Sequence, residues 1–193
     1  MASIFFRLLK DEVRQENLTT VSQFQDAPEG QWYTTAVATM EKMGILKGRT
    51  ETWFDPNAAI TRAEFAAICA RFDTTSTAPG SAFSDTEGHW AQGEICRAAA
   101  LGWINGYPDG TFRPDEPINR AEAMTMINRV LCRLPEKVED LLPGMHQWSD
   151  NADPDQWYYL AVQEATCSHE AEESGCHEVW KELLPDPDWT VYQ

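Results

Sequence analysis

The sequence predicts an all-α fold, a pseudo-threefold arrangement of helix-loop-helix repeats with long connecting loops. Three observations support this prediction. Residues recur at a constant offset of 58, apolar residues follow helical spacing, and an Arg-Ala-Glu that suits the start of a helix occurs twice. Chance does not space matches so evenly, so the chain is expected to repeat one structural unit.

Aligning Trp32 with Trp90 gives the register of the repeat. Each copy opens on Phe-x-Asp, at residues 24–26 and 83–85, and continues into an aromatic residue at the start of a first helix. The inward positions of that helix are expected to be Trp32, Val37 and Met40 in one copy and Trp90, Ile95 and Ala98 in the other. Identical residues at the offset include the pairs Gly44/Gly102, Gly48/Gly106, Phe54/Phe112, Arg62/Arg120, Glu64/Glu122 and Arg71/Arg129.

The second helix of each copy is expected to begin at a capping box. Thr61 and Asn119 are the N-cap residues, and Glu64 and Glu122 follow three residues later. In this motif the side chains at both positions accept hydrogen bonds from backbone N–H groups that the first turn leaves free. The apolar residues expected to be buried behind the caps are Phe65, Ile68, Cys69 and Phe72, and Ala123, Met126, Ile127, Val130 and Leu131.

The two ends of the chain are interpreted as partial copies. Residues 1–20 match the second half of a repeat, and residues 148–193 match a first half followed by a C-terminal tail. Together with full repeats at 24–73 and 83–134, they provide three first helices and three second helices. The hypothesis is that the terminal halves complete one another, so that all four segments form one compact domain.

Composition excludes several classes of function. The chain has 193 residues, with 15 Lys and Arg against 31 Asp and Glu, and a formal net charge of -16. Such a charge repels phosphate backbones and anionic membrane surfaces, so nucleic acid is not an expected partner. No stretch reaches the roughly 18 apolar residues of a membrane span. Hydrophobic residues at 42% and aromatic residues at 11% permit a packed core.

The stretch FSDTEGHWAQGEICRAAALGWINGYPDGTFRPDEPINRAEAMTMINR resembles an S-layer homology domain. The likeness spans nearly all of residues 83–131 and, more weakly, 24–73. It implies a non-catalytic module, monomeric in isolation, that binds an anionic and often pyruvylated cell-wall polysaccharide in grooves between repeats. It also implies an extracellular location in the cell wall or S-layer, although the start MASIFFRLLK does not read as a signal peptide.

Arg62 and Arg120 are the leading candidates for contact with an acidic sugar. Each lies in the first turn of a predicted helix, where free N–H groups and the helix dipole favour an anion. A planar guanidinium can hold a carboxylate through two hydrogen bonds. The alternative for both is a solvated or loop-bracing arginine. The resemblance adds sugar platforms at Trp32, Trp90 and Trp157, and residues that shape the groove wall at Asp26, Asp85, Gly48 and Gly106.

Purely structural roles are the alternative for several of these residues. The tryptophans could be core residues first, and Asp26 and Asp85 could cap turns. Departures from the family pattern limit the number of grooves. The first repeat has GRTETW at residues 48–53 in place of Gly-Tyr-Pro-Asp-Gly, and the last lacks its own Arg-Ala-Glu. At most two grooves would therefore carry this arginine.

No cofactor or metal is expected, and one weak zinc candidate is noted. The chain has five cysteines, of which Cys69, Cys96 and Cys132 are expected to be small core hydrophobes. Thiolate and imidazole groups together make a zinc-like ligand set, but the spacing here is not a standard one. A disulfide within the set, between its two cysteines, is the alternative. The candidate residues are Cys167, His169, Cys176 and His177.

Catalysis is not expected, because no motif pairs a nucleophile with a base or cradles a phosphate. The main alternative to glycan binding is a diverged repeat module that binds a protein partner. A less favoured alternative is a component of a wall-glycan hydrolase.

Overall fold

The computed structural model describes residues 1–72 and 82–192, so positions 73 and 193, which end two predicted segments, lie outside it. The chain consists of two compact units, Met1–Ile60 with Asp188–Gln193, and Thr61–Pro187. The unit boundary falls inside the first predicted repeat, between its two helices. That all four segments of the chain form one compact domain stays a prediction.

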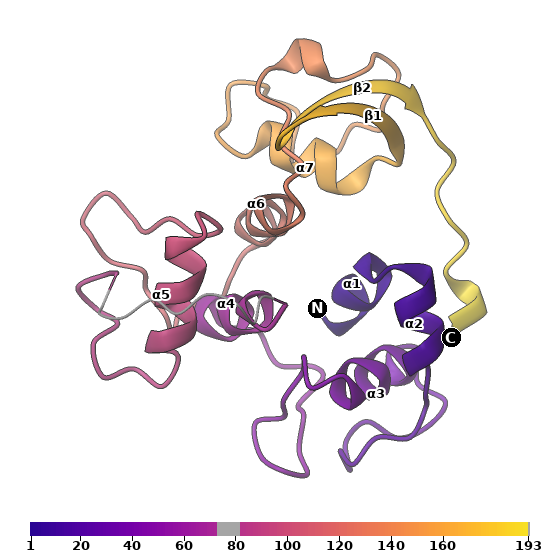
Figure 1. Ribbon diagram of the computed structural model, residues 1–193, viewed down its shortest axis with the longest axis vertical. Coiled ribbons are helices and arrows are strands. Elements are labelled where there is room, and N and C mark those ends of the chain that lie inside the picture. The colour runs from indigo at the N-terminus through magenta and orange to yellow at the C-terminus, as the bar shows by residue number, and fades with distance from the viewer. Residues whose placement is uncertain (73–81, 193) are drawn as a thin grey trace. The chain divides into compact units, whose positions relative to one another are not determined.

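The first unit contains the helices α1 (Ala2–Leu8), α2 (Asp11–Asn17) and α3 (Thr34–Lys42) and a C-terminal 3-10 turn, η2 (Thr190–Tyr192). Helix α1 packs against α3 (Figure 1). The contact buries apolar side chains of both helices, which removes them from water and stabilises the pair. These side chains include Phe5, Phe6, Val37 and Met40.

The predicted N-terminal helix is broken in two, and Arg14 accounts for the break. Its side chain is buried and donates hydrogen bonds to the carbonyl oxygens of Phe6 at 3.1 Å, Arg7 at 3.1 Å and Leu9 at 2.6 Å. These carbonyls lie at the end of α1, where backbone acceptors have no partner within the helix. The guanidinium therefore ends α1, and the chain turns before α2.

The second unit contains α4 (Arg62–Ala70), α5 (Gln92–Ala100), α6 (Arg120–Leu131) and α7 (Tyr159–Thr166). Helix α4 packs against α5, and α6 packs against α7. In each packed pair the second helix of one repeat meets the first helix of the next, as α1 and α3 do in the other unit. The helices that pack together in pairs are thus shifted by half a repeat relative to the repeat seen in the sequence.

The structure contains both capping boxes. The Thr61 side chain accepts a hydrogen bond from the Glu64 N–H at 3.2 Å, and the Glu64 carboxylate accepts one from the Thr61 N–H at 2.8 Å. The equivalent distances for Asn119 and Glu122 are 2.9 and 3.1 Å. These caps set the first residue of α4 and of α6, which in both helices is the arginine of Arg-Ala-Glu.

Four of the six predicted core positions of the first helices are correct. Val37, Met40, Ile95 and Ala98 are all buried, but the two tryptophans are not. Trp32 and Trp90 are 64% and 60% exposed, and Trp157 is 66% exposed. Each tryptophan lies two residues before its helix, outside the helical stripe, so its ring is not directed into the core. The prediction that the tryptophans are core residues is wrong. Phe72, predicted to be buried, is also exposed.

A β-hairpin contradicts the all-α prediction. Strands β1 (His169–Ser174) and β2 (His177–Leu183) pair antiparallel around Gly175, whose φ of 66° suits a tight turn. Strand β2 buries alternate side chains, Glu178 and Trp180, as a half-buried strand does. Trp180 forms a small core with Leu141 and Tyr159, which joins the hairpin to α7 (Figure 1).

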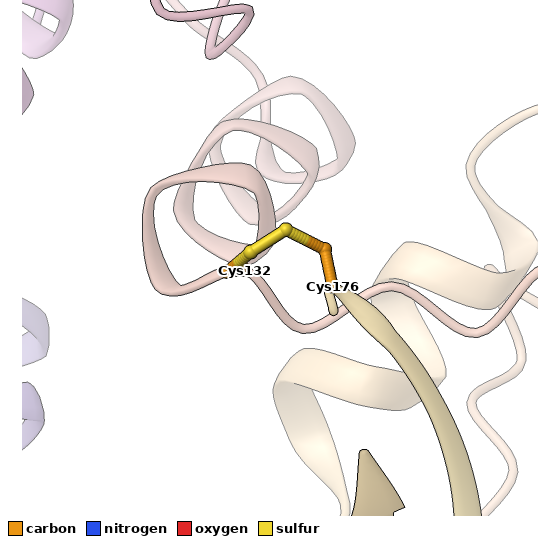
Figure 2. The surroundings of a disulfide bond; sticks show 2 residues. All are labelled: Cys132 and Cys176. Atoms are coloured by element: carbon orange, nitrogen blue, oxygen red, sulfur yellow. A yellow bond between two sulfur atoms is a disulfide. The ribbon is translucent and has the colours of Figure 1, made fainter. Parts of the chain in front are cut away.

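A disulfide between Cys132 and Cys176 joins the end of α6 to the hairpin turn (Figure 2). The prediction of Cys132 as a core hydrophobe is therefore wrong, because its side chain lies at the surface and is bonded to sulfur. The alternative disulfide from Cys167 to Cys176 is wrong as well. Cys69 and Cys96 are buried, as predicted, and burial raises the pKa of the Cys69 thiol to about 12.

Candidate binding cleft

The second unit contains a cleft of about 500 Å³, within the range of small-ligand sites. Its walls come from the first residue of α4, the loop after α5, one face of α6 and Trp157, which lies two residues before α7. Three successive repeats thus contribute to one cavity. The lining residues are Arg62, Trp103, Ile104, Asn105, Gly106, Tyr107, Pro108, Glu122, Thr125, Met126, Arg129 and Trp157.

Arg62 is fixed within the wall of the cleft. Its Nη1 lies 2.6 Å from Oε1 of Glu122, and its Nε donates a hydrogen bond to the Phe112 carbonyl at 2.8 Å. The guanidinium also lies over the rings of Phe112 and Tyr107, 4.7 and 5.0 Å from their centroids. The Glu122 carboxylate therefore compensates the charge of Arg62, whose side chain is buried and only 5% exposed.

Glu122 has more than the predicted capping role. One carboxylate oxygen accepts the Asn119 N–H, while the other contacts Arg62 and accepts the hydroxyl of Tyr107 at 2.9 Å. Burial and this hydrogen bond raise the pKa of Tyr107, which keeps the hydroxyl protonated as a donor. The cap, the ion pair and the tyrosine form one connected network at the base of the cleft.

Arg129 is the less compensated cation of the cleft. It lies in the last turn of α6, is partly buried, and forms no ion pair with any carboxylate among the described residues. Burial lowers the pKa of its guanidinium. When the side-chain amide of Asn105 is oriented so that its nitrogen donates to the Ile104 carbonyl oxygen, its own oxygen accepts a hydrogen bond from Arg129 at 3.2 Å. Arg62, Arg129 and Glu122 sum to a net charge of +1, on a chain whose net charge is -16.

Aromatic side chains supply the apolar part of the wall. Trp103 and Tyr107 are partly buried, whereas the Trp157 ring stands largely in solvent beside the opening. Such rings offer flat apolar surface, and their polar edges tolerate water. Their combination with a cation suits a ligand that has both an apolar face and a negative charge.

Arg120, the second predicted arginine, lies outside this cleft. Its Nη1 is 2.6 Å from Oδ2 of Asp150, and its guanidinium lies 4.9 Å from the Trp148 ring centroid. Its side chain is 37% exposed, so it is paired but not buried. The hydrogen bond from Arg120 lowers the pKa of Asp150.

The predicted wall residues hold the loops in shape. The Asp85 carboxylate accepts backbone N–H groups of Phe112 at 2.8 Å and Arg113 at 2.7 Å. Asp26 does the same for residues 54 and 55 in the first unit. A Cβ on Gly106 would lie 2.5 Å from the Phe83 ring, and one on Gly48 equally close to the Phe24 ring. Both glycines therefore leave room for an aromatic ring.

Sequence reasoning identified part of the cleft. The structure brings together Arg62, Gly106, Glu122 and Trp157, and places the other predicted site residues elsewhere. Arg129 was missed as a site residue, although it recurs at the offset as Arg71. The residues not in this cleft are Arg120, Trp32, Trp90, Asp26, Asp85 and Gly48.

The four-residue zinc candidate does not form. Cys176 is consumed by its disulfide with Cys132, so it cannot supply a thiolate. His177 contacts Asp140, with 3.0 Å between Nε2 and Oδ2. The four predicted ligands thus have different partners, and among the described residues only His169 belongs to a cluster of metal-binding groups.

In the part of the chain that the structure describes, the helices are too short or too polar to cross a lipid bilayer. Comparison with known families finds the S-layer homology domain at residues 23–66 and 82–124. The two matches coincide with the two repeats found from the offset of 58.

Three relatives illustrate this likeness. Over 87% of the chain, it is 32% identical to a cellulosome-anchoring protein and 30% identical to cell surface glycoprotein 1, both of Acetivibrio thermocellus. Over 61% of the chain, it is 29% identical to an S-layer protein of Bacillus thuringiensis subsp. finitimus. The chain spans only 38%, 8% and 16% of these relatives, in the same order.

Proposed function

Because the chain is an S-layer homology domain protein with repeats at residues 23–66 and 82–124, we propose that it binds an anionic cell-wall polysaccharide in the cleft of its second unit. S-layer homology domains are non-catalytic anchoring modules that bind cell-wall polymers, and relatives of this chain occur at the cell surface. The protein would thus attach itself, and any sequence joined to it, to a bacterial envelope.

The observation that carries the proposal is the local positive charge of the cleft. The chain as a whole repels anions, yet Arg129 faces the cleft with no carboxylate partner among the residues that the structure describes, and Arg62 neutralises Glu122. A carboxylate on the sugar, such as that of a pyruvyl group, would supply the missing partner of Arg129. Charge-assisted hydrogen bonds of this kind are the stronger class in proteins.

The aromatic wall supports a sugar rather than a small free anion. Trp103 and Trp157 offer apolar surface to the face of a sugar ring, and Asn105 and Thr125 offer polar groups to hydroxyls. The exposed Arg120, stacked on Trp148, is proposed as a second contact for the same polymer. Trp32 and Trp90 stay proposed sugar platforms, since both rings are exposed.

Cosedimentation with purified bacterial walls tests the proposal. The chain should pellet with intact walls and stay in solution after hydrofluoric acid has removed the secondary polysaccharide. Arg129→Gln should weaken pelleting by about tenfold or more, because it removes the cation. Lys181→Gln is the matched control, since it removes an exposed positive charge from the hairpin, outside the cleft. Equal pelleting of Arg129→Gln and wild type would refute the site.

The same assay separates the alternative functions. Binding that persists after the polysaccharide is removed would indicate a protein partner instead. Release of reducing sugar from the walls would indicate a hydrolase.

We also propose that the predicted pseudo-threefold arrangement holds. Its support is the triple occurrence of one pairing, a second helix against the next first helix, in α1 with α3, α4 with α5 and α6 with α7. Deleting residues 1–14 should then remove the cooperative unfolding transition of the chain. An unchanged melting curve would count against the arrangement.

A further inference from the structure

A buried cluster of Glu164, His169 and Glu178 lies outside the two matched repeats and is not used by the proposed function. Glu164 comes from α7, His169 from β1 and Glu178 from β2. One ligand atom of each residue lies within 4.8 Å of the other two. The side chains of Glu164, His169 and Glu178 are 0%, 0% and 3% exposed.

The orientation of His169 suits a metal ligand. Its Nδ1 lies 2.7 Å from the Cys167 carbonyl oxygen, which can only accept, so Nδ1 carries the proton. In a neutral imidazole the lone pair of Nε2 is then directed toward the cluster, where Nε2 lies 3.3 Å from Oε2 of Glu164 and 3.2 Å from Nη2 of Arg133. Histidine ligands of metals are normally held through the other ring nitrogen in this way.

The carboxylates are also held in place. The indole N–H of Trp180 donates a hydrogen bond to Oε2 of Glu164 at 2.7 Å, and the Trp180 ring stacks on His169. Such outer contacts orient a ligating carboxylate. By contrast, Oε2 of Glu178 is buried and has no hydrogen-bond partner within the described part of the chain. A buried carboxylate oxygen without a partner is costly, so a cation at this place would be stabilising.

The guanidinium of Arg133 contacts all three residues of the cluster in the structure. Its Nη2 lies 2.9 Å from Oε1 of Glu164 and 3.2 Å from Nε2 of His169, and its Nε lies 3.4 Å from Oε1 of Glu178. One guanidinium cannot neutralise two carboxylates, and with a neutral imidazole the cluster keeps a charge of -1. A divalent cation would neutralise both carboxylates.

We propose that Glu164, His169 and Glu178 bind one divalent transition-metal ion, such as Zn²⁺, in competition with the guanidinium of Arg133. Two carboxylates and an imidazole are a ligand set for such ions, and three protein ligands leave one position for water. Arg133 is 36% exposed, so it can swing toward solvent and open the path of entry. The ion would tie α7 to both strands of the hairpin.

Metal binding to the full chain tests this proposal. The chain is stripped with a chelator, incubated with ZnCl₂ and separated from free ion by gel filtration, and its zinc is measured by elemental analysis. About one zinc per chain is expected, together with a rise in Tm that CaCl₂ does not produce, because Ca²⁺ prefers oxygen ligands. Co²⁺ should give the d–d absorption of a tetrahedral or five-coordinate site.

Variants locate the ion. Glu178→Gln and His169→Gln should each lower the affinity for Zn²⁺ by about tenfold or more. His177→Gln, in the same hairpin, and Cys167→Ser are the matched controls and should bind as wild type does. Circular dichroism establishes that each variant is folded before it is compared.

Arg133→Gln distinguishes a competing cation from a permanent ion-pair partner. If the guanidinium competes with the metal, its removal should raise the affinity for Zn²⁺, while unchanged affinity contradicts the competition. The whole proposal is overturned if the wild-type chain shows no zinc-dependent rise in Tm. It is overturned equally if zinc is retained in full by Glu178→Gln and His169→Gln.

Discussion

Arg62 and Glu122 are joined by an ion pair of 2.6 Å, although they belong to successive repeats. Each occupies one end of an Arg-Ala-Glu, the arginine in the first copy and the glutamate in the second. The motif therefore acts across a repeat boundary. Its arginine buttresses the wall of the cleft, and its glutamate caps a helix and compensates that arginine at the same time.

We predict that Glu122→Gln lowers the free energy of unfolding by about 1–2 kcal/mol. Glutamine can still accept the N-cap N–H, so the capping box is kept, but the charge that compensates the buried Arg62 is lost. Urea denaturation followed by circular dichroism measures the change.

Asp150→Asn is the matched control for this variant. It removes the carboxylate that pairs with Arg120, but that pair is exposed to solvent, where ion pairs contribute little. The Tm of Asp150→Asn should equal that of wild type. If both variants are equally stable, the Arg62–Glu122 pair has no structural role.

Local patterns in the sequence were sufficient to predict the start of each second helix. A capping box involves residues only three positions apart, so Thr61 and Glu64 could be paired without knowledge of the fold. The same holds for the buried stripe of α4, where Phe65, Ile68 and Cys69 are buried as predicted. Trp32 was misplaced because it precedes its helix and does not share the helical period.

Contacts between repeats could not be predicted in this way. The pairing of Arg62 with Glu122, and the place of Arg129 in the cleft, depend on how α4, α6 and the loop after α5 pack. The hairpin was missed because β1 is acidic and largely exposed, and only β2 has fully buried side chains at alternate positions. The positions of five cysteines do not determine which of them form a disulfide, so the partner of Cys132 could not be predicted from the sequence either.

Gly106→Ala is predicted to lower the free energy of unfolding by about 1–3 kcal/mol. The new Cβ would lie 2.5 Å from the Phe83 ring and 2.6 Å from the Thr111 carbonyl oxygen, and the backbone atom cannot easily move away. Because Gly106 also lines the cleft, binding to walls should fall as well.

Gly93→Ala is the control for that substitution. Gly93 lies in α5, where a Cβ meets nothing within 4 Å, and alanine is the better helix former. This variant should be as stable as wild type or more stable by up to about 1 kcal/mol. Equal Tm values for Gly106→Ala and wild type would show that the loop relaxes around the methyl group.

Removing the Cys132–Cys176 disulfide is predicted to lower the free energy of unfolding by about 2–4 kcal/mol. The bond joins residues 44 positions apart, and it restricts the unfolded chain more than the folded one. The double variant with serine at both positions is compared with wild type by urea denaturation without reductant.

Cys167→Ser provides the comparison, because Cys167 is a free thiol in the same part of the chain. It should retain the stability of wild type, and dithiothreitol should destabilise it as much as it destabilises wild type. If dithiothreitol leaves the Tm of wild type unchanged, the disulfide does not stabilise the hairpin.

The contact between Asp140 and His177 predicts a loss of stability in acid. Burial opposes ionisation of Asp140, but its hydrogen bonds with His177 and two backbone N–H groups prevail and lower the pKa of the carboxyl. The folded chain therefore binds fewer protons than the unfolded chain. The stabilisation is complete above the ordinary aspartate pKa of about 4 and is lost as the pH falls through the lower folded-state pKa.

Asp140→Asn should therefore lower the Tm at pH 7 and reduce the fall in Tm between about pH 5 and pH 3. Glu139→Gln is the control, since it removes the same charge from an exposed neighbour in the 3-10 turn η1 (Val138–Asp140). Its Tm should follow the wild-type curve over the whole range. Parallel curves for Asp140→Asn and wild type would mean that the acid sensitivity of the chain arises at other carboxylates. The prediction thus places part of that sensitivity where η1 meets β2, away from the cleft.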